Sequence, residues 1–459
     1  MAAFETETVV DPIVIDGSIL EGGGQVIRSA LSLAFLSERP LILHSIRAGR
    51  ADRGGGGLKP QHLESVRIAA TLSGKKLTHD VKGSSDLICE TQPIMQDNSE
   101  NGGGAEEQSN VVVIADTGTA GAVTLILQAA LPPLVFAAKR NTEIRLLGGT
   151  NVDFSPPIDH FELVILPLLK KMGIDIDYNL IKRGFVPKGG GEVSICAQLN
   201  RDNSSLKEKE EEGKERTGSL KPIQLIEQGE VIKIVGNIVF TSGFNENIIN
   251  EFMEILQMKL NKMFSVPLNN ASIILNLNAD MINHSNTSND NQVAASSSTP
   301  TITDKNNSSD PQIIEDTKNQ KGNLSKKSFK KNKKKQLGNV SVQLALHTST
   351  ECILSCNYLR TQSKIDNSWI SKYIDKLLND ISFLLMNKIC VDEHTADQLI
   401  IWMSLAKGTS KIITPKQSQQ TSQHLETVIH FAKELTGAMF KTTELESGLL
   451  IECNGIGLC

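Results

Sequence analysis

"RGFVPKGGGEV", residues 183–193, sets three consecutive glycines between Lys188 and Glu192, just before a run that resembles a strand. A second triplet lies in "EGGGQVIRSA", residues 21–30, where the run that follows resembles a helix. Glycine triplets cost backbone entropy, but they let other groups, including phosphates, come close to the backbone. Neither triplet has the spacing of a P-loop or of a dinucleotide-binding turn. By pattern alone a tight connection is the more frequent explanation, and a phosphate contact is the alternative.

The composition describes a chain of 459 residues with an aliphatic core, because 39% of the residues are hydrophobic and only 4% are aromatic. This length is sufficient for two or three domains. The formal net charge of −5 gives no global attraction to nucleic acid, so a site for a polyanion must be a local cluster. Seven dispersed cysteines indicate reduced thiols in the cytosol or nucleus. The acidic N-terminus and the short apolar runs predict neither a signal peptide nor a membrane span.

Three polar stretches interrupt the pattern of strands and helices. They cover residues 96–110, 200–220 and 281–338, and they lack the apolar periodicity of a packed element. The longest is rich in Asn, Ser, Thr and Lys, so we expect a disordered low-complexity loop. It ends in "KKSFKKNKKK", Lys326–Lys335, which holds seven lysines in ten residues.

Between these stretches, strands and helices alternate, which is typical of a mixed α/β protein. The expected strands cover 12–18, 40–48, 231–240, 271–279, 340–348 and 448–457. The expected helices cover 24–37, 60–74, 120–137, 160–173, 246–262, 368–387 and 423–437. The ordered part of 221–389 has its own strands and helices, which suggests an inserted α/β domain.

Basic and polar residues cluster near the first glycine triplet. Arg28 follows the EGGGQ loop by about one helical turn, and "SIRAGR" carries Arg47 and Arg50 at a strand end. Guanidinium groups in such a position can bind phosphates through paired hydrogen bonds. Gln61 and His62 follow shortly afterwards. A solvated loop is the alternative, and by itself the more frequent one.

The C-terminal part carries further candidate groups. "VDEHTADQL", residues 391–399, places Glu393 and Asp397 at a probable helix start, where a carboxylate either caps the helix or serves a metal or nucleotide site. His424 and His430 share the last helix. A lone histidine is usually a satisfied surface or core group, and nothing local marks either one as a nucleophile.

Taken together, these stretches resemble the RNA 3′-terminal phosphate cyclase family. The resemblance covers nearly the whole chain outside the three polar stretches, and its motifs follow the order of the family. The matching motifs are "DGSILEGGGQVIRSALSL", "SIRAGR", "PQHL", "TAGAVTLILQ" followed by "LP", "GGTN" with "PP", "RGFVPKGGGEV", "ADQLIIWMSLA" and "IECNGIG".

The resemblance implies an α/β (α+β) fold with a large domain of three repeated units, each a four-stranded sheet with two helices. A smaller α/β domain is inserted. On this basis the large domain comprises residues 1–195 and 390–459, and the inserted domain comprises 196–389. The triplet in residues 183–193 is then a site of tight backbone packing at the junction of the two domains.

The resemblance also implies an ATP-dependent, ligase-class enzyme that converts an RNA 3′-phosphate into a 2′,3′-cyclic phosphate. A histidine attacks the α-phosphorus of ATP, the adenylate moves to the RNA 3′-phosphate, and the adjacent 2′-OH expels AMP. The expected ligands are ATP, Mg²⁺ or another divalent cation, and RNA with a 3′-phosphate end. Imidazole suits this step because it is neutral and nucleophilic at physiological pH.

The roles of individual residues follow from the same resemblance. His424, in "HLET", corresponds to the nucleophile, and Glu21 corresponds to a metal-associated glutamate. Arg28, Arg47 and Arg50 correspond to phosphate-facing arginines. Two further sets are implied: Gln61 and His62 as polar residues lining the phosphate and RNA site, and Gln128, His394, Thr395, Ala396, Asp397 and Gln398 as ATP-binding positions.

The chain departs from the family pattern at several positions. His394 stands where the family usually has a tyrosine, and a histidine stacks on adenine more weakly. "DRGGGGLK" is longer than the usual turn, and "NYLRTQSK", residues 357–364, replaces a Gly-Lys-Arg-Gly pattern. The family has a cyclase-like branch in ribosomal RNA processing that lacks the histidine, and His424 argues against that branch. Enolpyruvyl transferases are a third alternative, based on fold analogy alone.

The lysine run Lys326–Lys335 has two explanations of equal weight. It is either a nuclear-import or RNA-tethering segment or a solubilising part of the low-complexity stretch. With the reduced cysteines, this run leads us to expect a nuclear location, with the cytoplasm as the alternative.

Overall fold

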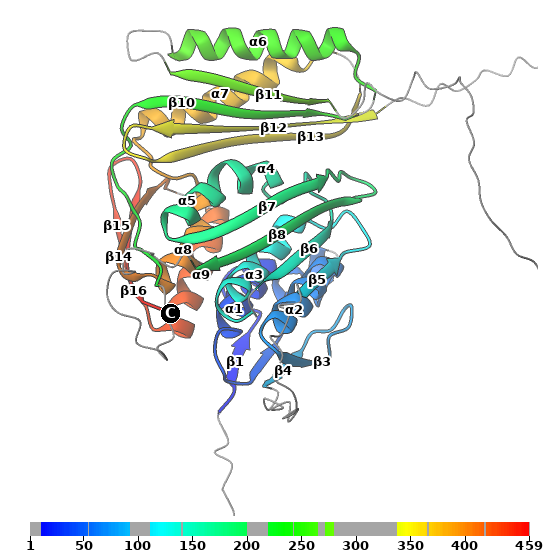
Figure 1. The fold of residues 1–459 in the computed structure, drawn as a ribbon, viewed down its shortest axis with the longest axis vertical. Helices are drawn as coiled ribbons and strands as arrows, with labels where there is room; N and C mark the ends of the chain where they lie inside the picture. The colour runs from blue at the N-terminus through cyan, green and yellow to red at the C-terminus, as the bar shows by residue number, and fades with distance from the viewer. Residues whose placement is uncertain are drawn as a thin grey trace, which may run out of the picture.

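The described residues form four sheets of four strands each, with helices packed between and beside them (Figure 1). The predicted α/β (α+β) class is confirmed. The expected low-complexity loop, residues 281–338, lies outside the described residues as far as position 336. The described residues also exclude Lys326–Lys335, 96–110 and 200–218. The computed structural model describes residues 11–53, 55–91, 111–138, 141–199, 219–241, 243–264, 271–279, 337–364, 367–416 and 419–458.

The first repeated unit places its strands in the order β1-β2-β4-β3, in which β1 and β2 are parallel and the other pairs are antiparallel. Its two helices follow the first two strands, so the chain runs β-α-β-α-β-β. A short 3₁₀ helix, η1, precedes the second of these helices. The elements are β1 (Ile13–Asp16), α1 (Gly24–Ala34), β2 (Leu41–His44), η1 (Ala48–Arg53), α2 (Pro60–Leu72), β3 (Lys75–Thr78) and β4 (Leu87–Thr91).

The second unit repeats this order as β5-β6-β8-β7. Its first helix, α3, is apolar on every side and continues through Pro132 and Pro133, as suits a helix buried at the centre of the protein. The elements are β5 (Val111–Asp116), α3 (Val123–Phe136), β6 (Thr142–Gly148), α4 (Ile158–His160), the π-helical turn η2 (Phe161–Ile165), α5 (Leu166–Lys171), β7 (Ile174–Lys182) and β8 (Gly191–Leu199).

The third unit has the order β9-β14-β16-β15, but its first strand is separated from the rest by the inserted unit. β9 pairs in parallel with β14, and β8 extends to Leu199, so the sheet of the inserted unit begins later than the predicted boundary at residue 196. The elements are β9 (Gln224–Leu225), α8 (Glu393–Leu405), β14 (Lys407–Thr414), α9 (Gln419–Thr436), β15 (Met439–Glu444) and β16 (Leu449–Ile456).

The inserted unit forms its sheet in the different order β11-β10-β12-β13. Helices α6 and α7 cover one face of this sheet, and the other face looks toward α4 and β7 (Figure 1). The apolar stripe of α6 joins a core of its own with the strands and α7. The elements are β10 (Val231–Phe240), α6 (Glu246–Phe264), β11 (Ser272–Ala279), β12 (Leu337–Thr348), β13 (Ile353–Lys364) and α7 (Ile370–Met386).

The three repeated units meet through their helices, which lie in the middle of the large part with the sheets around them (Figure 1). Helix α1 packs on α3 and α9, and α8 packs on α9. A site at these contacts therefore draws residues from all three units.

The stretch 183–193 connects β7 to β8 within the second unit, and Arg183 reaches the inserted unit through Asp159. Arg183 binds the buried Asp159 through two hydrogen bonds of 2.6 and 2.7 Å. Asp159 also accepts a hydrogen bond of 3.0 Å from Asn237 of β10. The glycines pack tightly: a Cβ on Gly189 would meet the backbone carbonyl of Thr119, and one on Gly184 would meet the backbone of β6 and β8. The predicted tight packing is confirmed at Gly189 and Gly191, but these close approaches lie within the second unit and not at the predicted junction with the inserted unit.

Candidate active site

The EGGGQ loop leads directly into α1 and packs against η1. Gly22 has φ +56° and accepts a backbone hydrogen bond of 3.0 Å from Gly49. A Cβ on Gly23 would occupy the space of the Glu21 carboxylate. The triplet therefore lets a carboxylate fold back beside the start of a helix, where backbone N–H groups attract negative charge.

Glu21 is the centre of a polar cluster, and only 4% of its side chain is exposed. Its Oε1 accepts a hydrogen bond of 2.5 Å from Arg50, and its Oε2 accepts one of 3.2 Å from the backbone N–H of Gln25. Burial opposes ionisation, but the hydrogen bond from Arg50 and the charges of His424 and Arg28 together lower the pKa of Glu21. The carboxylate is therefore ionised at neutral pH.

His424 of α9 faces this carboxylate across the contact between α9 and the loop. Its Nε2 lies 3.9 Å from Glu21 Oε1, and 31% of its side chain is exposed. Burial and the positive charges of Arg28 and Arg50 lower the pKa of His424, while Glu21 opposes this effect. Thr427, one turn further along, accepts a hydrogen bond of 3.3 Å from the backbone N–H of Glu21 and so fixes α9 against the loop. His424 is thus a neutral, accessible imidazole.

The predicted arginines converge on the same cluster. Arg28 donates hydrogen bonds to Gln128 (3.1 Å) and to Gln25 (2.6 Å). Burial lowers the pKa of Arg28 to about 10, although Glu21 and Asp397 act in the opposite direction. The guanidinium remains charged at neutral pH and connects the cluster around Glu21 to the pocket described below.

Arg47 and His62 form the other side of the cluster. Arg47 has φ +57° and donates hydrogen bonds to the carbonyls of Gly55 and Gly57, at 3.3 and 3.1 Å, while its buried Nε has no hydrogen-bond partner among the described residues. His62 is buried, and burial together with the charges of Arg28 and Arg47 lowers its pKa to about 3. His62 is therefore a neutral hydrogen-bonding group beside the arginines.

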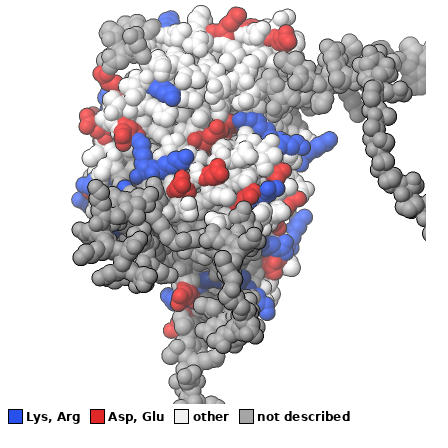
Figure 2. All heavy atoms as spheres, viewed as in Figure 1, with Lys and Arg blue, Asp and Glu red and all other residues white. Residues whose placement is uncertain are grey.

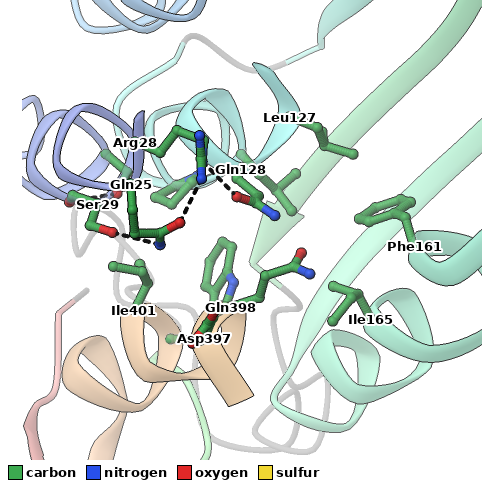
Figure 3. Close-up of a pocket in the computed structure, with 14 residues that line it drawn as sticks. Gln25, Arg28, Ser29, Leu127, Gln128, Phe161, Ile165, Asp397, Gln398 and Ile401 are labelled. Atoms are coloured by element: carbon green, nitrogen blue, oxygen red, sulfur yellow. Dashed lines mark hydrogen bonds between the residues drawn. The ribbon is translucent and has the colours of Figure 1, made fainter. Parts of the chain in front are cut away.

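A pocket lies beside this cluster, between α1, α3, α8 and η2 (Figure 3). Arg28, Gln128, Asp397 and Gln398 present polar groups to it, and Phe161 forms part of its apolar wall. His424 and Glu21 do not line this pocket, but Arg28, which does, interacts electrostatically with both. The arrangement suits an elongated ligand with a flat apolar part in the pocket and a charged part beside Glu21. The remaining lining residues are Gln25, Ser29, Ser32, Leu127, Leu131, Pro132, Ile165, Ile401 and Trp402.

Asp397 carries an unsatisfied polar atom into the pocket region. Its buried Oδ1 has no hydrogen-bond partner within the described part of the chain. Burial and the neighbouring charge of Glu393 raise the pKa of Asp397 well above its usual value, against the effect of Arg28. Buried polar atoms are nearly always satisfied, so this carboxyl group is a candidate to bind a ligand.

The predicted ATP-binding segment 394–398 divides at the start of α8. Asp392 caps the helix by accepting hydrogen bonds from the backbone N–H groups of His394 and Thr395, each 3.0 Å long. Thr395 is fully buried and bonds His160 at 3.1 Å, and Ala396 is part of the main hydrophobic core. Thr395, Ala396 and His394 do not line the pocket, and His394 is exposed next to Glu393.

Gln61 has a supporting position. Its Oε1 accepts a hydrogen bond of 3.1 Å from the backbone N–H of Ala122, which precedes α3. The structure thus brings Glu21, the three arginines, His62 and His424 into one cluster and joins it to Gln128, Asp397 and Gln398 through Arg28.

Several residues of the site were not predicted from the sequence. Two of them, Gln25 and Thr427, stand inside the quoted motifs EGGGQ and HLET, so the motifs themselves could have indicated them. Phe161 and Trp402 lie in apolar helical runs, where an aromatic residue is usually interpreted as part of the hydrophobic core. Their position at the pocket depends on the π-helical turn and on the packing of α8, which the pattern does not express.

The cluster offers one carboxylate to a divalent cation. No group of three or more His, Cys, Asp or Glu side chains that could hold a metal occurs among the described residues. Mg²⁺ is commonly bound by one or two carboxylates together with substrate phosphates and water. Glu21 is the carboxylate of the cluster that could hold such an ion, if a phosphate-bearing ligand supplied the other oxygens.

A sequence model of the family described as RNA 3′-terminal phosphate cyclase matches residues 19–442. The chain belongs to this family. The match includes every residue of the cluster and of the pocket. Within the described ranges, no helix has the length and apolar character needed to cross a membrane.

Curated relatives carry the name of the family in distant organisms. A "Probable RNA 3′-terminal phosphate cyclase" of Dictyostelium discoideum is 30% identical over 96% of this chain and 82% of its own length. An "RNA 3′-terminal phosphate cyclase" of Drosophila melanogaster is 27% identical over 96% of both chains. The RNA 3′-terminal phosphate cyclase of Saccharolobus islandicus strain M.14.25 is 41% identical over 40% of this chain and 49% of its own length.

Proposed function

We propose that this protein is a catalytically active RNA 3′-terminal phosphate cyclase that works through an adenylate on His424. The observation that supports the proposal is the position of His424 Nε2, 3.9 Å from Glu21 Oε1, in a cluster that Arg28 connects to the pocket. Adenine would occupy the pocket, with Asp397 and Gln398 available to its polar edge, and the phosphates would extend toward Glu21 and the arginines.

In the first step, the lone pair of His424 Nε2 forms a bond to the α-phosphorus of ATP, and the bond to the bridging oxygen breaks to release pyrophosphate. Arg28, Arg47 and Arg50 offset the charge that develops on the phosphate oxygens. A divalent cation held by Glu21 would supply further charge neutralisation and orientation of the phosphates.

In the second step, an oxygen of the RNA 3′-phosphate takes the adenylate and the P–N bond to His424 breaks. The 2′-oxygen of the terminal ribose then attacks the RNA phosphorus, and AMP leaves with the oxygen that joined the two phosphates. The lowered pKa of His424 keeps the imidazole nucleophilic at neutral pH.

The test is incubation with ATP labelled at the α-phosphate and Mg²⁺, followed by detection of an acid-labile, alkali-stable protein adduct. We expect the adduct in the wild-type protein and its loss in His424→Ala. His430→Ala is the matched control, because His430 lies on the same helix, is exposed and pairs with Glu434 instead of with Glu21. A wild-type protein that forms no adduct and cyclises no 3′-phosphate RNA would contradict the proposal.

The second candidate is a non-catalytic, cyclase-like factor in ribosomal RNA processing. It predicts no adduct and cosedimentation with pre-ribosomal particles. The catalytic alternative is favoured because an accessible His424 lies next to an ionised carboxylate and several arginines. A protein that only binds RNA does not need a nucleophile in this arrangement.

We further propose that the protein acts in the nucleus and that Lys326–Lys335 serves nuclear import or RNA tethering. The motivation is the density of lysines in this run, which suits both an import receptor and a phosphate backbone.

A further inference from the structure

Phe154 combines two properties that a bulky apolar residue normally avoids. Its relative exposure is 102%, so its ring contacts almost nothing, and its φ is +63°. A left-handed conformation is strained for a bulky residue, and such strain is concentrated at functional sites. The fold gains no burial from this ring in return for the strained backbone.

The residues around Phe154 are nevertheless held in place. The side chain of Thr361 in β13 donates a hydrogen bond of 2.9 Å to Asp153 Oδ2, and Ser155 Oγ donates one of 3.1 Å to the carbonyl of Val152. Val152 itself is buried in a small apolar cluster with Leu125. The loop therefore presents a free ring on a fixed base, which reduces the entropy lost when a ligand binds.

This loop leads directly to the nucleotide pocket. Pro156 and Pro157 line a small cavity together with Gln128 and Gln398. Thr124 of α3 donates a hydrogen bond of 2.9 Å to the carbonyl of Pro156 and fixes that end of the loop. Phe154 is two residues from Pro156, so its backbone lies within about 7 Å of the cavity wall.

The position of the ring suits an unpaired base of the RNA substrate. In the proposed reaction the 3′-phosphate must reach the adenylate, so the terminal nucleotides must lie at the edge of the pocket. Single-stranded RNA is commonly bound by stacking of splayed bases on aromatic side chains. A protein partner would require an extended apolar patch, whereas the polar Asp153 and Ser155 flank this single ring.

We propose that Phe154 is a stacking platform for a base at or next to the 3′ end of the RNA. This inference rests on the proposed function only in taking RNA with a 3′-phosphate as the substrate. It concerns recognition of RNA and not the reaction of His424 with ATP.

The test uses a short single-stranded RNA with a 3′-phosphate and 2-aminopurine near its 3′ end. Stacking on Phe154 should quench the fluorescence of the 2-aminopurine. Phe154→Asn removes the ring and retains a residue that tolerates the left-handed conformation, and we expect it to abolish the quenching and to weaken binding roughly 5- to 150-fold. Phe154→Tyr should preserve both. Phe383→Ala, at a half-exposed phenylalanine of α7, should change neither.

The outcomes separate this proposal from the proposed function. Adenylate formation without RNA should be equal in the wild type and Phe154→Asn, because the ring has no part in that step. If the asparagine variant binds and quenches like the wild type, or if the wild type binds no RNA, the stacking role is refuted. If quenching depends on Phe154 but the wild type forms no adenylate, the stacking role stands and the proposed catalysis fails.

Discussion

Glu21 and Arg50 act on the pKa of His424 in opposite directions, although they are bonded to each other. The carboxylate raises this pKa, whereas Arg50, Arg28 and burial lower it, and the net result is a lowered pKa. The imidazole thus stays neutral at pH 7 while a carboxylate lies 3.9 Å away. A nucleophile next to a polyanionic substrate needs this balance, because each phosphate that enters would otherwise favour the protonated form.

Two substitutions should move the acid limb of the adenylation rate in opposite directions. Glu21→Gln removes a charge that raises the pKa of His424, so the limb should shift to lower pH. Arg50→Gln removes a charge that lowers this pKa, so the limb should shift to higher pH. Both variants should also lose maximal rate, since they lose phosphate or cation contacts. The measurement is the single-turnover rate of adenylate formation against pH.

An NMR titration of His424 in the same variants provides a control that does not depend on the rate. The order of the titration midpoints should be Glu21→Gln, wild type, Arg50→Gln, from low to high pH. Shifts of both variants in one direction would contradict the electrostatic account.

At the scale of elements, neighbouring glycines of the 183–193 stretch allow a matched comparison. Gly189 and Gly190 have similar φ values, +67° and +71°. A Cβ at Gly189 would collide with the Thr119 carbonyl, whereas one at Gly190 meets nothing within 4 Å. Gly190→Ala should therefore cost about 1–2 kcal/mol of unfolding free energy from backbone strain alone. Gly189→Ala should cost roughly 1–3 kcal/mol more, because the packing is also disturbed.

Urea unfolding of the two alanine variants checks this difference. Equal losses at the two positions would show that the left-handed conformation alone, and not the close approach to the Thr119 carbonyl, explains the glycines.

The pair of Arg183 and Asp159 should stabilise the contact between the second unit and the inserted unit. Both side chains are almost fully buried, with 8% and 1% exposed. Asp159→Asn leaves a buried guanidinium without its counter-charge, and we expect a loss of about 3–5 kcal/mol of unfolding free energy. The exposed pair of Arg67 and Asp80 is the control, and Arg67→Met should cost at most about 1 kcal/mol.

A double-mutant cycle with Asp159→Asn and Arg183→Met tests whether the two residues act as a pair. The double variant should lose clearly less stability than the sum of the single losses. Additive losses would indicate that each residue acts through other partners, such as Asn237.

The sequence predicted the helices well, but it did not predict the contacts between separate units, for physical reasons. Periodicity located most helices, because their apolar faces are buried against one another. The helix expected over 120–137 is confirmed as α3, including Pro132 and Pro133, since packing on α1 and α2 outweighs the local cost of proline. The pairing of Arg183 with Asp159 and the burial of Thr395 depend on how separate units are placed, which no local pattern encodes. His424 emerged only from the order of motifs along the whole chain.

At the scale of the whole molecule, the site exists only where the three repeated units meet. The first unit supplies Glu21 and the arginines, the second supplies Gln128, and the third supplies His424 and Asp397. The inserted unit contributes no side chain to the cluster or to the pocket within the described residues, but its β13 holds the loop of Phe154. The phosphate cluster, the pocket and the proposed RNA contact of Phe154 thus all belong to the large part, and the inserted unit supports the Phe154 loop through Thr361.

This division predicts that the stretch 280–336 can be removed without loss of adenylation. Ala279, at the end of β11, and Val340 of β12 both pair with Phe240, on opposite sides of β10. Ala279 and Val340 are therefore about 10 Å apart across the sheet, and Leu337, where the linker would end, lies about 10 Å further along β12. A linker of about six residues spans this distance. Replacement of 280–336 by such a Gly/Ser linker should leave the unfolding free energy and the adenylation of His424 unchanged.

The same replacement should abolish nuclear accumulation of a fluorescent fusion or reduce the salt dependence of RNA binding, because Lys326–Lys335 is lost. If location and salt dependence both stay as in the wild type, the lysine run has neither role; if adenylation falls, the stretch takes part in the chemistry after all.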